Sequence, residues 1–211
     1  EVDLTVIRNI VSQTISGLRA FHRMDMLHQD LKPGNIMITG EGLVKLVDFG
    51  STKIAGIADI STPVERSELL GTKNYTAPEY LLGESGTTRS DMFSLGCIIY
   101  EMITKKLPFG NALSRSSDQA SLRKLKYQPI SNHVSNIPHW MDKAIRTAVQ
   151  VNPDNRYEKL SELEADLRKP NSSYLKEDSV PLIERNPVVF WRTTSLVLFA
   201  SNLILLYLYV K

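Results

Sequence analysis

The chain has little cysteine: Cys97 is the only one among 211 residues, so an intrachain disulfide is excluded. Cys97 lies in the apolar run from Leu95 to Met102, and we expect a buried thiol in a reducing compartment. Charge of one sign is also lacking, because 25 Lys and Arg against 23 Asp and Glu give a formal net charge of +2. The basic residues are scattered, so no nucleic-acid partner is expected.

An internal repeat and a histidine cluster at metal-ligand spacing are missing as well. His22, His133 and His139 are far apart in the sequence, and we expect each to be structural or exposed. At 211 residues, the chain is long enough for one sizeable core.

Two short motifs contain acidic, amide and amine side chains suited to phosphate chemistry. They are His28-Gln29-Asp30-Leu31-Lys32-Pro33-Gly34-Asn35 and Asp48-Phe49-Gly50. Asp30 is placed to accept the proton of an attacking hydroxyl, and Lys32 to bring positive charge near a phosphoryl group. Asn35 and Asp48 supply an amide oxygen and a carboxylate, which are ligands that Mg²⁺ prefers. The motifs therefore predict metal-assisted phosphoryl transfer.

The segment between the motifs has the pattern of a β-hairpin. Residues 36–39 and 43–47 are short apolar stretches on either side of Gly40-Glu41-Gly42, a loop rich in glycine. A hairpin would bring Asn35 and Asp48 to the same end, where both side chains can reach one metal ion.

Each motif alone is weak evidence, because such short patterns are more often turns or capped helix ends. Their order and spacing, together with further motifs downstream, are far more specific. The downstream motifs are Gly71-Thr72, Tyr75, Ala77-Pro78-Glu79, Asp91-Met92-Phe93-Ser94-Leu95-Gly96 and Pro153-Asp154-Asn155-Arg156. With these residues, the chain resembles the Ser/Thr branch of the protein kinase superfamily.

The resemblance implies a fold that is mainly α-helical with short β-hairpins, corresponding to the C-terminal lobe of a protein kinase over residues 1–170. It implies ATP with Mg²⁺ or Mn²⁺ as cofactors and a protein as substrate. Asp30 would be the catalytic base, Lys32 the phosphate-contacting lysine and Thr72 the threonine that contacts both. Asn35 and Asp48 would be the metal ligands and, with Lys32, would bind the nucleotide.

The resemblance also implies structural roles. Glu79 and Arg156 would form a buried ion pair, Asp91 would brace the catalytic loop from below, and His28 would support that loop. Removing one member of a buried pair would cost roughly 3 to 5 kcal/mol, because the other charge would be stranded. The alternative for Glu79 and Arg156 is that both are ordinary surface charges.

One departure from the family pattern is Gln29, which stands where an arginine is usual. A neutral glutamine cannot pair with a phosphate group, so a phosphorylated activation loop cannot dock there. We therefore expect activity that does not depend on phosphorylation of this loop. Its hydroxyl residues are Ser51, Thr52, Ser61, Thr62 and Ser67.

A larger departure concerns the start of the chain. The sequence begins at Glu1, and no glycine-rich phosphate loop, strand lysine or helix glutamate precedes the catalytic motifs. Since the resembled family holds ATP between two lobes, we expect the N-terminal lobe to be missing. This stretch would then be part of a longer protein and would bind nucleotide poorly and have little or no activity alone.

Helical periodicity predicts the other elements. The apolar face of a first helix would consist of Leu4, Ile7, Val11, Ile15, Leu18 and Phe21. A strongly apolar central helix would begin at a cap on Ser90 or Asp91, continue through Ile103 and end before Pro108. Further helices are expected at residues 117–126, 140–149 and 160–169.

The composition changes after Pro170. Residues 171–187 are polar and read as a linker, whereas residues 188–210 are overwhelmingly apolar. At about 1.5 Å per residue, a helix over the second stretch would span about 35 Å, enough to cross a hydrocarbon core of about 30 Å. We expect a single-pass, C-terminal transmembrane anchor, with a buried terminal helix as the alternative.

Arg192 is the main objection to a membrane helix. At the bilayer centre it would cost roughly 2.5 to 3.5 kcal/mol, but one turn inside the boundary it can reach the interface. Arg185 and Arg192 precede or enter the span and Lys211 follows it, so the positive-inside rule favours a cytoplasmic catalytic domain.

The C-terminal half resembles one group of kinases in particular: bacterial, membrane-anchored Ser/Thr kinases fused to a metal-dependent protein phosphatase domain. The residues that carry this resemblance are the runs 152–162, 166–171, 181–187 and 190–192. It implies a possible phosphatase domain in the same polypeptide.

Three functions compete at this point. An active Ser/Thr protein kinase is favoured because Asp30, Lys32, Asn35 and Asp48 are all present. A pseudokinase acting as a membrane-anchored scaffold would usually lose at least one of them. A kinase-fold phosphotransferase for small molecules is disfavoured by the substrate-platform motifs at Gly71-Thr72 and Ala77-Pro78-Glu79.

Overall fold

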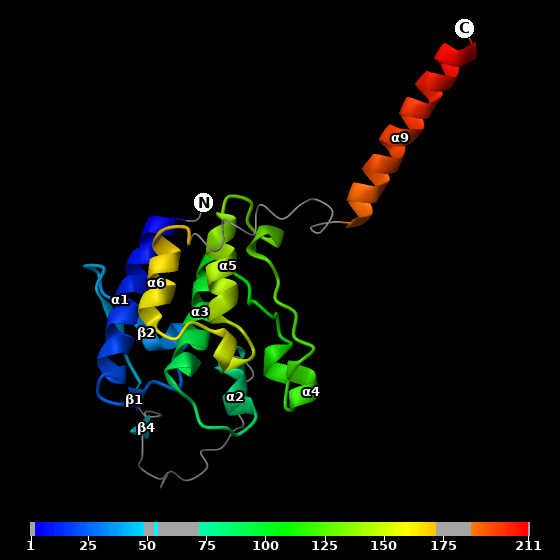
Figure 1. Cartoon of the computed structure of the whole chain (residues 1–211). Coiled ribbons are helices and arrows are strands. Elements are labelled where there is room, and N and C mark those ends of the chain that lie inside the picture. Colours follow the sequence, from blue (N-terminus) through cyan, green and yellow to red (C-terminus); the bar gives the residue numbers. More distant parts are fainter. Residues whose placement is uncertain (1–2, 49–52, 55–71, 172–186, 211) are drawn as a thin grey trace. The chain divides into compact units, whose positions relative to one another are not determined.

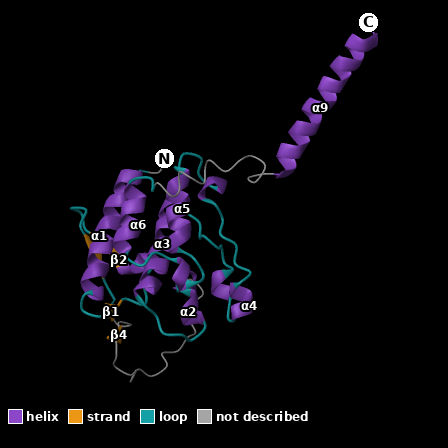
Figure 2. Ribbon diagram, in the orientation of Figure 1, coloured by secondary structure: helices purple, strands orange, loops and turns teal. Residues whose placement is uncertain are grey.

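The computed structural model describes residues 3–48, 53–54, 72–171 and 187–210. The chain divides into two compact units, Glu1–Pro170 and Asn171–Lys211. Figure 2 shows that the regular secondary structure of the first unit is mainly helical and that its strands are short. The described helices are α1 (Leu4–His22), α2 (Pro78–Leu81), α3 (Thr88–Thr104), α4 (Gln119–Leu122), α5 (His139–Ala148), α6 (Leu160–Arg168) and α9 (Pro187–Val210). The described strands are β1 (Met26–Leu27), β2 (Ile36–Ile38), β3 (Val44–Leu46) and β4 (Lys53–Ile54).

Short 3₁₀ turns connect these elements. They are η1 (Pro33–Asn35), η3 (Thr72–Asn74), η4 (Leu113–Arg115), η5 (Ile130–Asn132) and η6 (Pro153–Asn155). The strands form two separate antiparallel pairs, β1 with β4 and β2 with β3. The expectation of a mainly helical fold with short hairpins is therefore confirmed for the first unit.

Helix α3 is the centre of the first unit. Every residue from Ser90 to Tyr100 is buried, as expected for a helix that is enclosed on all sides. It contacts α1 and α5, and α6 contacts both α1 and α5, so the four helices lie side by side (Figure 1). Cys97 is fully buried in this core, as predicted.

Helix α1 follows the predicted apolar spacing. Ile7, Val11, Ile15 and Leu18 are buried, whereas the ends of the predicted stripe are only partly covered. The side chain of Asp3 caps the helix by accepting hydrogen bonds from the backbone of Thr5 (2.8 Å) and of the next residue. The predicted first helix is confirmed.

The predicted cap of α3 at Ser90 or Asp91 is wrong. Thr87 caps the helix: its hydroxyl accepts from the Arg89 N–H at 3.2 Å, and the Ser90 hydroxyl accepts from the Thr87 N–H at 2.9 Å. This reciprocal capping box starts the helix earlier and leaves Asp91 available for contacts with another part of the chain. The helix ends at Thr104, beside Lys105 in a left-handed conformation (φ 57°).

The helix predicted at residues 117–126 is much shorter. Only Gln119–Leu122 is α-helical, because the backbones of Lys124 and Leu125 bond three residues back and tighten the chain into turns. The helices predicted at 140–149 and 160–169 are found within one residue at each end as α5 and α6.

Apart from Asn171, the described part of the second unit is helix α9. Its stretch Val189–Tyr209 has a mean hydropathy of 1.5, and among the described residues it is the one helix long and apolar enough to cross a membrane. None of its described side chains is buried, and those of Leu196 and Phe199 are 71% and 67% exposed. Most of the predicted linker, residues 172–186, lies outside the described residues.

Candidate active site

The hairpin between the two motifs forms as predicted. Strands β2 and β3 pair with Ile36 opposite Leu46 and Ile38 opposite Val44. The loop includes Gly42 at φ 79°, a left-handed conformation that glycine adopts without steric cost.

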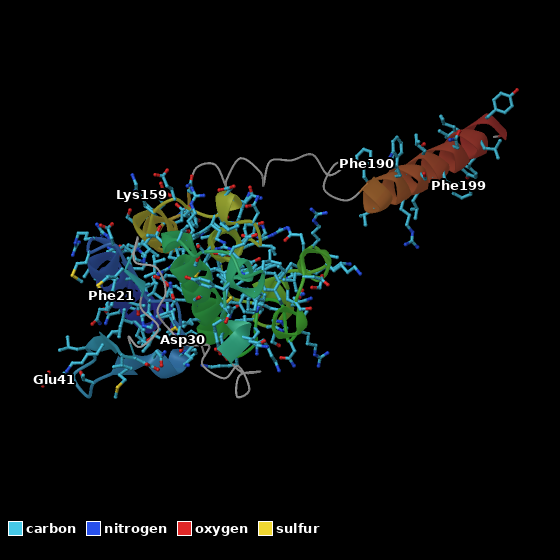
Figure 3. All side chains as sticks on the ribbon, turned by 90° about the horizontal axis from the view of Figure 1, so that it is seen from below. Phe21, Asp30, Glu41, Lys159, Phe190 and Phe199 are labelled. Atoms are coloured by element: carbon cyan, nitrogen blue, oxygen red, sulfur yellow. The ribbon has the colours of Figure 1, made fainter. Side chains whose placement is uncertain are left out.

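The pairing continues past the strands and places the two predicted metal ligands together. The Val47 N–H donates to the carbonyl of Asn35 at 3.0 Å, so these two residues lie opposite each other. Asp48 is the next residue after Val47. Figure 3 shows the labelled Asp30 at the end of the hairpin that is remote from Glu41 in its loop. The same end of the hairpin therefore carries residues of both motifs.

Three predicted site residues are joined by hydrogen bonds. The Lys32 amine lies 2.7 Å from Oδ2 of Asp30. The amide nitrogen of Asn35 donates to the Asp30 carbonyl at 2.8 Å and is 3.3 Å from Oδ2 of the same residue. Asn35 is buried, whereas the side chains of Asp30 and Lys32 are 24% and 26% exposed. The Asp30 carboxylate is thus fixed by an amine and an amide while one side of it stays open to solvent.

The donor set at the hairpin end suits a hard divalent cation. Because the Asn35 amide nitrogen is directed at Asp30, its oxygen is left for a ligand, and Asp48 adds an exposed carboxylate at a left-handed backbone position (φ 64°). In the described ranges, no three His, Cys, Asp or Glu side chains are grouped so that they could enclose a metal. A cation held by Asn35 and Asp48 would therefore need phosphate oxygens and water, which is the usual arrangement for Mg²⁺.

Thr72 is the fifth predicted site residue. Its backbone opens η3, but its side chain, and with it the expected contact to Asp30 and Lys32, lies outside the described residues. The same holds for Phe49 and Gly50 of the second motif and for the hydroxyl residues of the predicted activation loop.

Asp91 braces the loop that carries Asp30, as expected. Its two carboxylate oxygens accept the backbone N–H groups of His28 and Gln29, each at 3.0 Å. Gln29 has φ 65°, and a left-handed conformation of a non-glycine residue persists only where its surroundings enforce it. Asp91, which is only 1% exposed, therefore fixes the backbone just before the catalytic-base candidate.

His22 is a member of this network that sequence reasoning did not assign. Its Nε2 lies 2.8 Å from Oδ2 of Asp91, so the last turn of α1 is tied to the same carboxylate. The contact joins residues 69 positions apart, and no local pattern encodes such a contact. Its one sequence signal is a histidine at the end of the helix that leads into the first motif.

Glu79 and Arg156 form the predicted buried ion pair. Two parallel hydrogen bonds of 2.8 Å join the guanidinium to the two carboxylate oxygens. Burial by itself raises the pKa of Glu79, but the hydrogen bonds and charge of Arg156, together with the Ser90 hydroxyl, hold it below its usual value. The guanidinium also lies over the Phe93 ring, 4.9 Å from its centroid. Its remaining donors bond the carbonyls of Arg89, Gln150 and Val151.

Comparison with known proteins gives a consistent family. Residues 2–166 match the family described as "Protein kinase domain". The chain is 34% identical over 163 residues to "Serine/threonine-protein kinase PknB" of Mycobacterium leprae, covering 77% of this chain and 26% of the relative. It is 36% identical over 153 residues to "Probable serine/threonine-protein kinase CPE1738" of Clostridium perfringens, covering 72% of this chain and 22% of the relative.

The chain spans about a quarter of the length of these curated relatives. Among solved structures, the kinase domain of PknI from Mycobacterium tuberculosis is similar, with a TM-score of 0.58 and 20% identity. The similarity covers 80% of this chain and 56% of that chain, and at this identity it concerns the fold alone.

Proposed function

The chain belongs to the protein kinase family, and from this premise we propose that, as part of a longer protein, it transfers the γ-phosphoryl group of ATP to Ser or Thr side chains of protein substrates. The observation that supports this most is the cluster of Asp30, Lys32 and Asn35 beside the hairpin end that carries Asp48. A scaffold would not require all four residues, so their presence favours catalysis.

In the proposed mechanism, Asp30 accepts the proton of the substrate hydroxyl and orients it for attack. The Lys32 amine lies 2.7 Å from the Asp30 carboxylate. Its positive charge would stabilise the phosphoryl group while that group is transferred from ATP to the substrate hydroxyl. Thr72 would contact both residues. The catalytic loop itself contributes position, because Asp91 holds its backbone through two hydrogen bonds.

Asn35 and Asp48 are the proposed ligands of Mg²⁺ or Mn²⁺. The metal would neutralise the charge of the ATP phosphates. The hydrogen bond from the Asn35 amide nitrogen to the Asp30 carbonyl orients the side chain so that its amide oxygen would be the atom that binds the metal. With Lys32, these residues form the nucleotide-binding side of the site.

We further propose that residues 1–170 are a partial kinase domain, residues 171–187 a linker and residues 188–210 a transmembrane helix, with the catalytic domain in the cytoplasm. Helix α9 supports the last part by its length and by how it satisfies its polar groups. The Thr194 hydroxyl and the Asn202 amide each donate to the carbonyl four residues earlier, at 2.9 Å. Such bonds lower the cost of polar side chains in hydrocarbon.

Replacing Asp30 by Asn tests the proposed reaction. In the full-length protein, we expect phosphate incorporation from ATP into a protein substrate to fall roughly 100- to 10,000-fold through loss of the general base. Asp25→Asn is a matched control, because it makes the same chemical change at an exposed residue only five positions before Asp30. A near-normal rate for the Asp30 variant, or an equal loss in both variants, would remove Asp30 from this role.

A further inference from the structure

A second polar pocket lies away from the candidate active site. It lies where the end of α1 meets the beginnings of α3 and α6, and it has a volume of about 300 Å³. Figure 3 shows Lys159, one of the residues that line it, well separated from Asp30. The pocket is lined by Arg19, His22, Arg23, Thr88, Met92, Glu158, Lys159, Leu160 and Ser161.

Three exposed cations line this pocket. Arg19 and Arg23 are four residues apart and share one face at the end of α1, where like charges repel each other. Lys159 approaches from α6. None of these three side chains pairs with a carboxylate of another described residue. The arrangement is suited to an anion that would bridge them.

Helix stability does not explain all of these charges. The two arginines are favoured by the negative end of the α1 dipole, but Lys159 stands at the N-cap of α6, where the dipole disfavours a cation and Ser, Thr, Asp or Asn would be preferred. The Glu162 carboxylate accepts the backbone N–H groups of Glu158 and Lys159, and the Glu162 N–H donates to the Lys159 carbonyl. An anion in the pocket would pair with the Lys159 amine and lie near the N–H groups of Leu160 and Ser161. The Lys159 amine is therefore available to a ligand in the pocket.

The charge and size of the pocket fit a phosphate monoester. The three cations and the Glu158 carboxylate give a formal charge of +2 when His22 is neutral. A phosphate monoester carries about −1.5 to −2 at pH 7, so the two nearly balance. Met92 and Leu160 are the apolar residues of the lining, and both are buried.

The pocket is connected to the catalytic loop by one side chain. His22 lines it, and the His22 ring bonds Asp91, which in turn accepts the backbone N–H groups of His28 and Gln29. A ligand that orders His22 would also order the backbone before Asp30. We propose that this pocket binds the phosphate group of a phosphomonoester, and that binding steadies the catalytic loop through His22 and Asp91.

The phosphate group has two plausible sources, a soluble ester and a lipid headgroup. The first arm of the test therefore uses glycerol 3-phosphate with the full chain in phosphatidylcholine nanodiscs, and the second uses nanodiscs that contain phosphatidic acid. Phosphatidylserine nanodiscs control for negative charge without a phosphomonoester. Binding in the first arm alone identifies a soluble ligand, and binding in the second alone identifies a lipid.

The variant Arg19→Gln/Arg23→Gln should weaken binding of the effective probe roughly tenfold or more, because two charge-assisted contacts are lost. Arg115→Gln/Arg123→Gln is the matched control: it removes the same charge from two exposed arginines outside this pocket and should bind as the parent does. No saturable binding of either probe, or equal binding by the two double variants, would overturn the site.

Hydrogen exchange tests the connection to the catalytic loop and needs no kinase activity. The probe should slow exchange of the His28 and Gln29 amides in the parent chain. His22→Phe should retain probe binding within a few-fold and lose this protection. Protection that persists in His22→Phe, or that is absent from the parent when the probe is bound, would contradict the connection.

Discussion

The residues on which the fold depends most are charged groups removed from water. Arg156 is 5% and Glu79 4% exposed, yet almost every polar atom of the pair has a hydrogen-bond partner. A buried charge is tolerated only when it is paired in this way. The pair joins α2 to the segment that follows α5, so it holds the first unit together across 77 positions of sequence.

Arg156→Met tests the energetic role of this pair. It leaves the Glu79 carboxylate buried without its partner, and we expect the free energy of unfolding to fall by roughly 3 to 5 kcal/mol. Urea-induced unfolding of the full chain in detergent measures this. The double variant Glu79→Gln/Arg156→Met should recover part of the loss, because no charge is stranded. A loss below about 1 kcal/mol in the single variant would mean that the pair behaves as a surface ion pair.

At the scale of helices and strands, the close approach of α3 and α5 depends on a glycine. A Cβ atom at Gly96 would lie 2.7 Å from Cγ1 of Val149 and 3.1 Å from Cβ of Ala148. Both neighbours are at most 1% exposed, so neither has free space into which to move. The two helices could not pack at this distance with a larger residue at this position.

We therefore expect Gly96→Ala to destabilise the first unit. Overpacking costs typically about 1 to 3 kcal/mol, which outweighs the gain of up to about 1 kcal/mol from the better helix propensity of alanine. The melting temperature should fall. Adding Val149→Ala removes the shortest contact and should recover part of the loss introduced by Gly96→Ala. An unchanged or higher melting temperature for Gly96→Ala would show that the interface can relax.

The elements that could be predicted are those with local signals. The hairpin follows from two apolar stretches around a glycine loop, and α1 from its apolar spacing. The cap of α3 is predicted three or four residues beyond its true position, because Thr87, Ser90 and Asp91 are all residue types that can cap a helix. Asp91 instead accepts the backbone N–H groups of His28 and Gln29, and these contacts between distant parts of the chain have no local sequence signal. The extent of α4 was overestimated because its polar stretch has few apolar positions to define an end.

The candidate site divides in the same way. Asp30, Lys32 and Asn35 lie within six residues, and their hydrogen bonds follow from that spacing and the turn between them. The proximity of Asp48 follows from the hairpin. The bond from His22 to Asp91 arises from tertiary packing of α1 against α3, for which the sequence carries no local signal.

At the scale of the whole molecule, the two compact units differ in their relation to solvent. The first has a core built around α3, whereas the described side chains of α9 are mainly exposed and apolar. An apolar helix of 24 residues, about 36 Å at 1.5 Å per residue, matches a hydrocarbon core better than water. The membrane is therefore the proposed environment of the second unit.

Membrane extraction tests this proposal. We expect the full chain to stay in the membrane fraction after alkaline carbonate treatment, because burying the Leu, Val and Phe side chains of α9 favours insertion. A chain without residues 188–210 should move to the soluble fraction. Arg192→Leu, which removes the charge near the start of the span, should remain membrane-bound. Release of the full chain by carbonate would refute a transmembrane helix and favour a peripheral one.

The central claim is that one divalent cation can be held by Asn35 and Asp48 beside Asp30. Paramagnetic broadening of backbone amide signals by Mn²⁺ tests this most directly, because it detects weak binding and requires no catalysis. We predict the strongest broadening at residues 30, 35 and 48, and a marked loss of it in Asp48→Asn but not in the exposed control Asp154→Asn. Broadening spread evenly over exposed carboxylates and unchanged by Asp48→Asn would contradict the account.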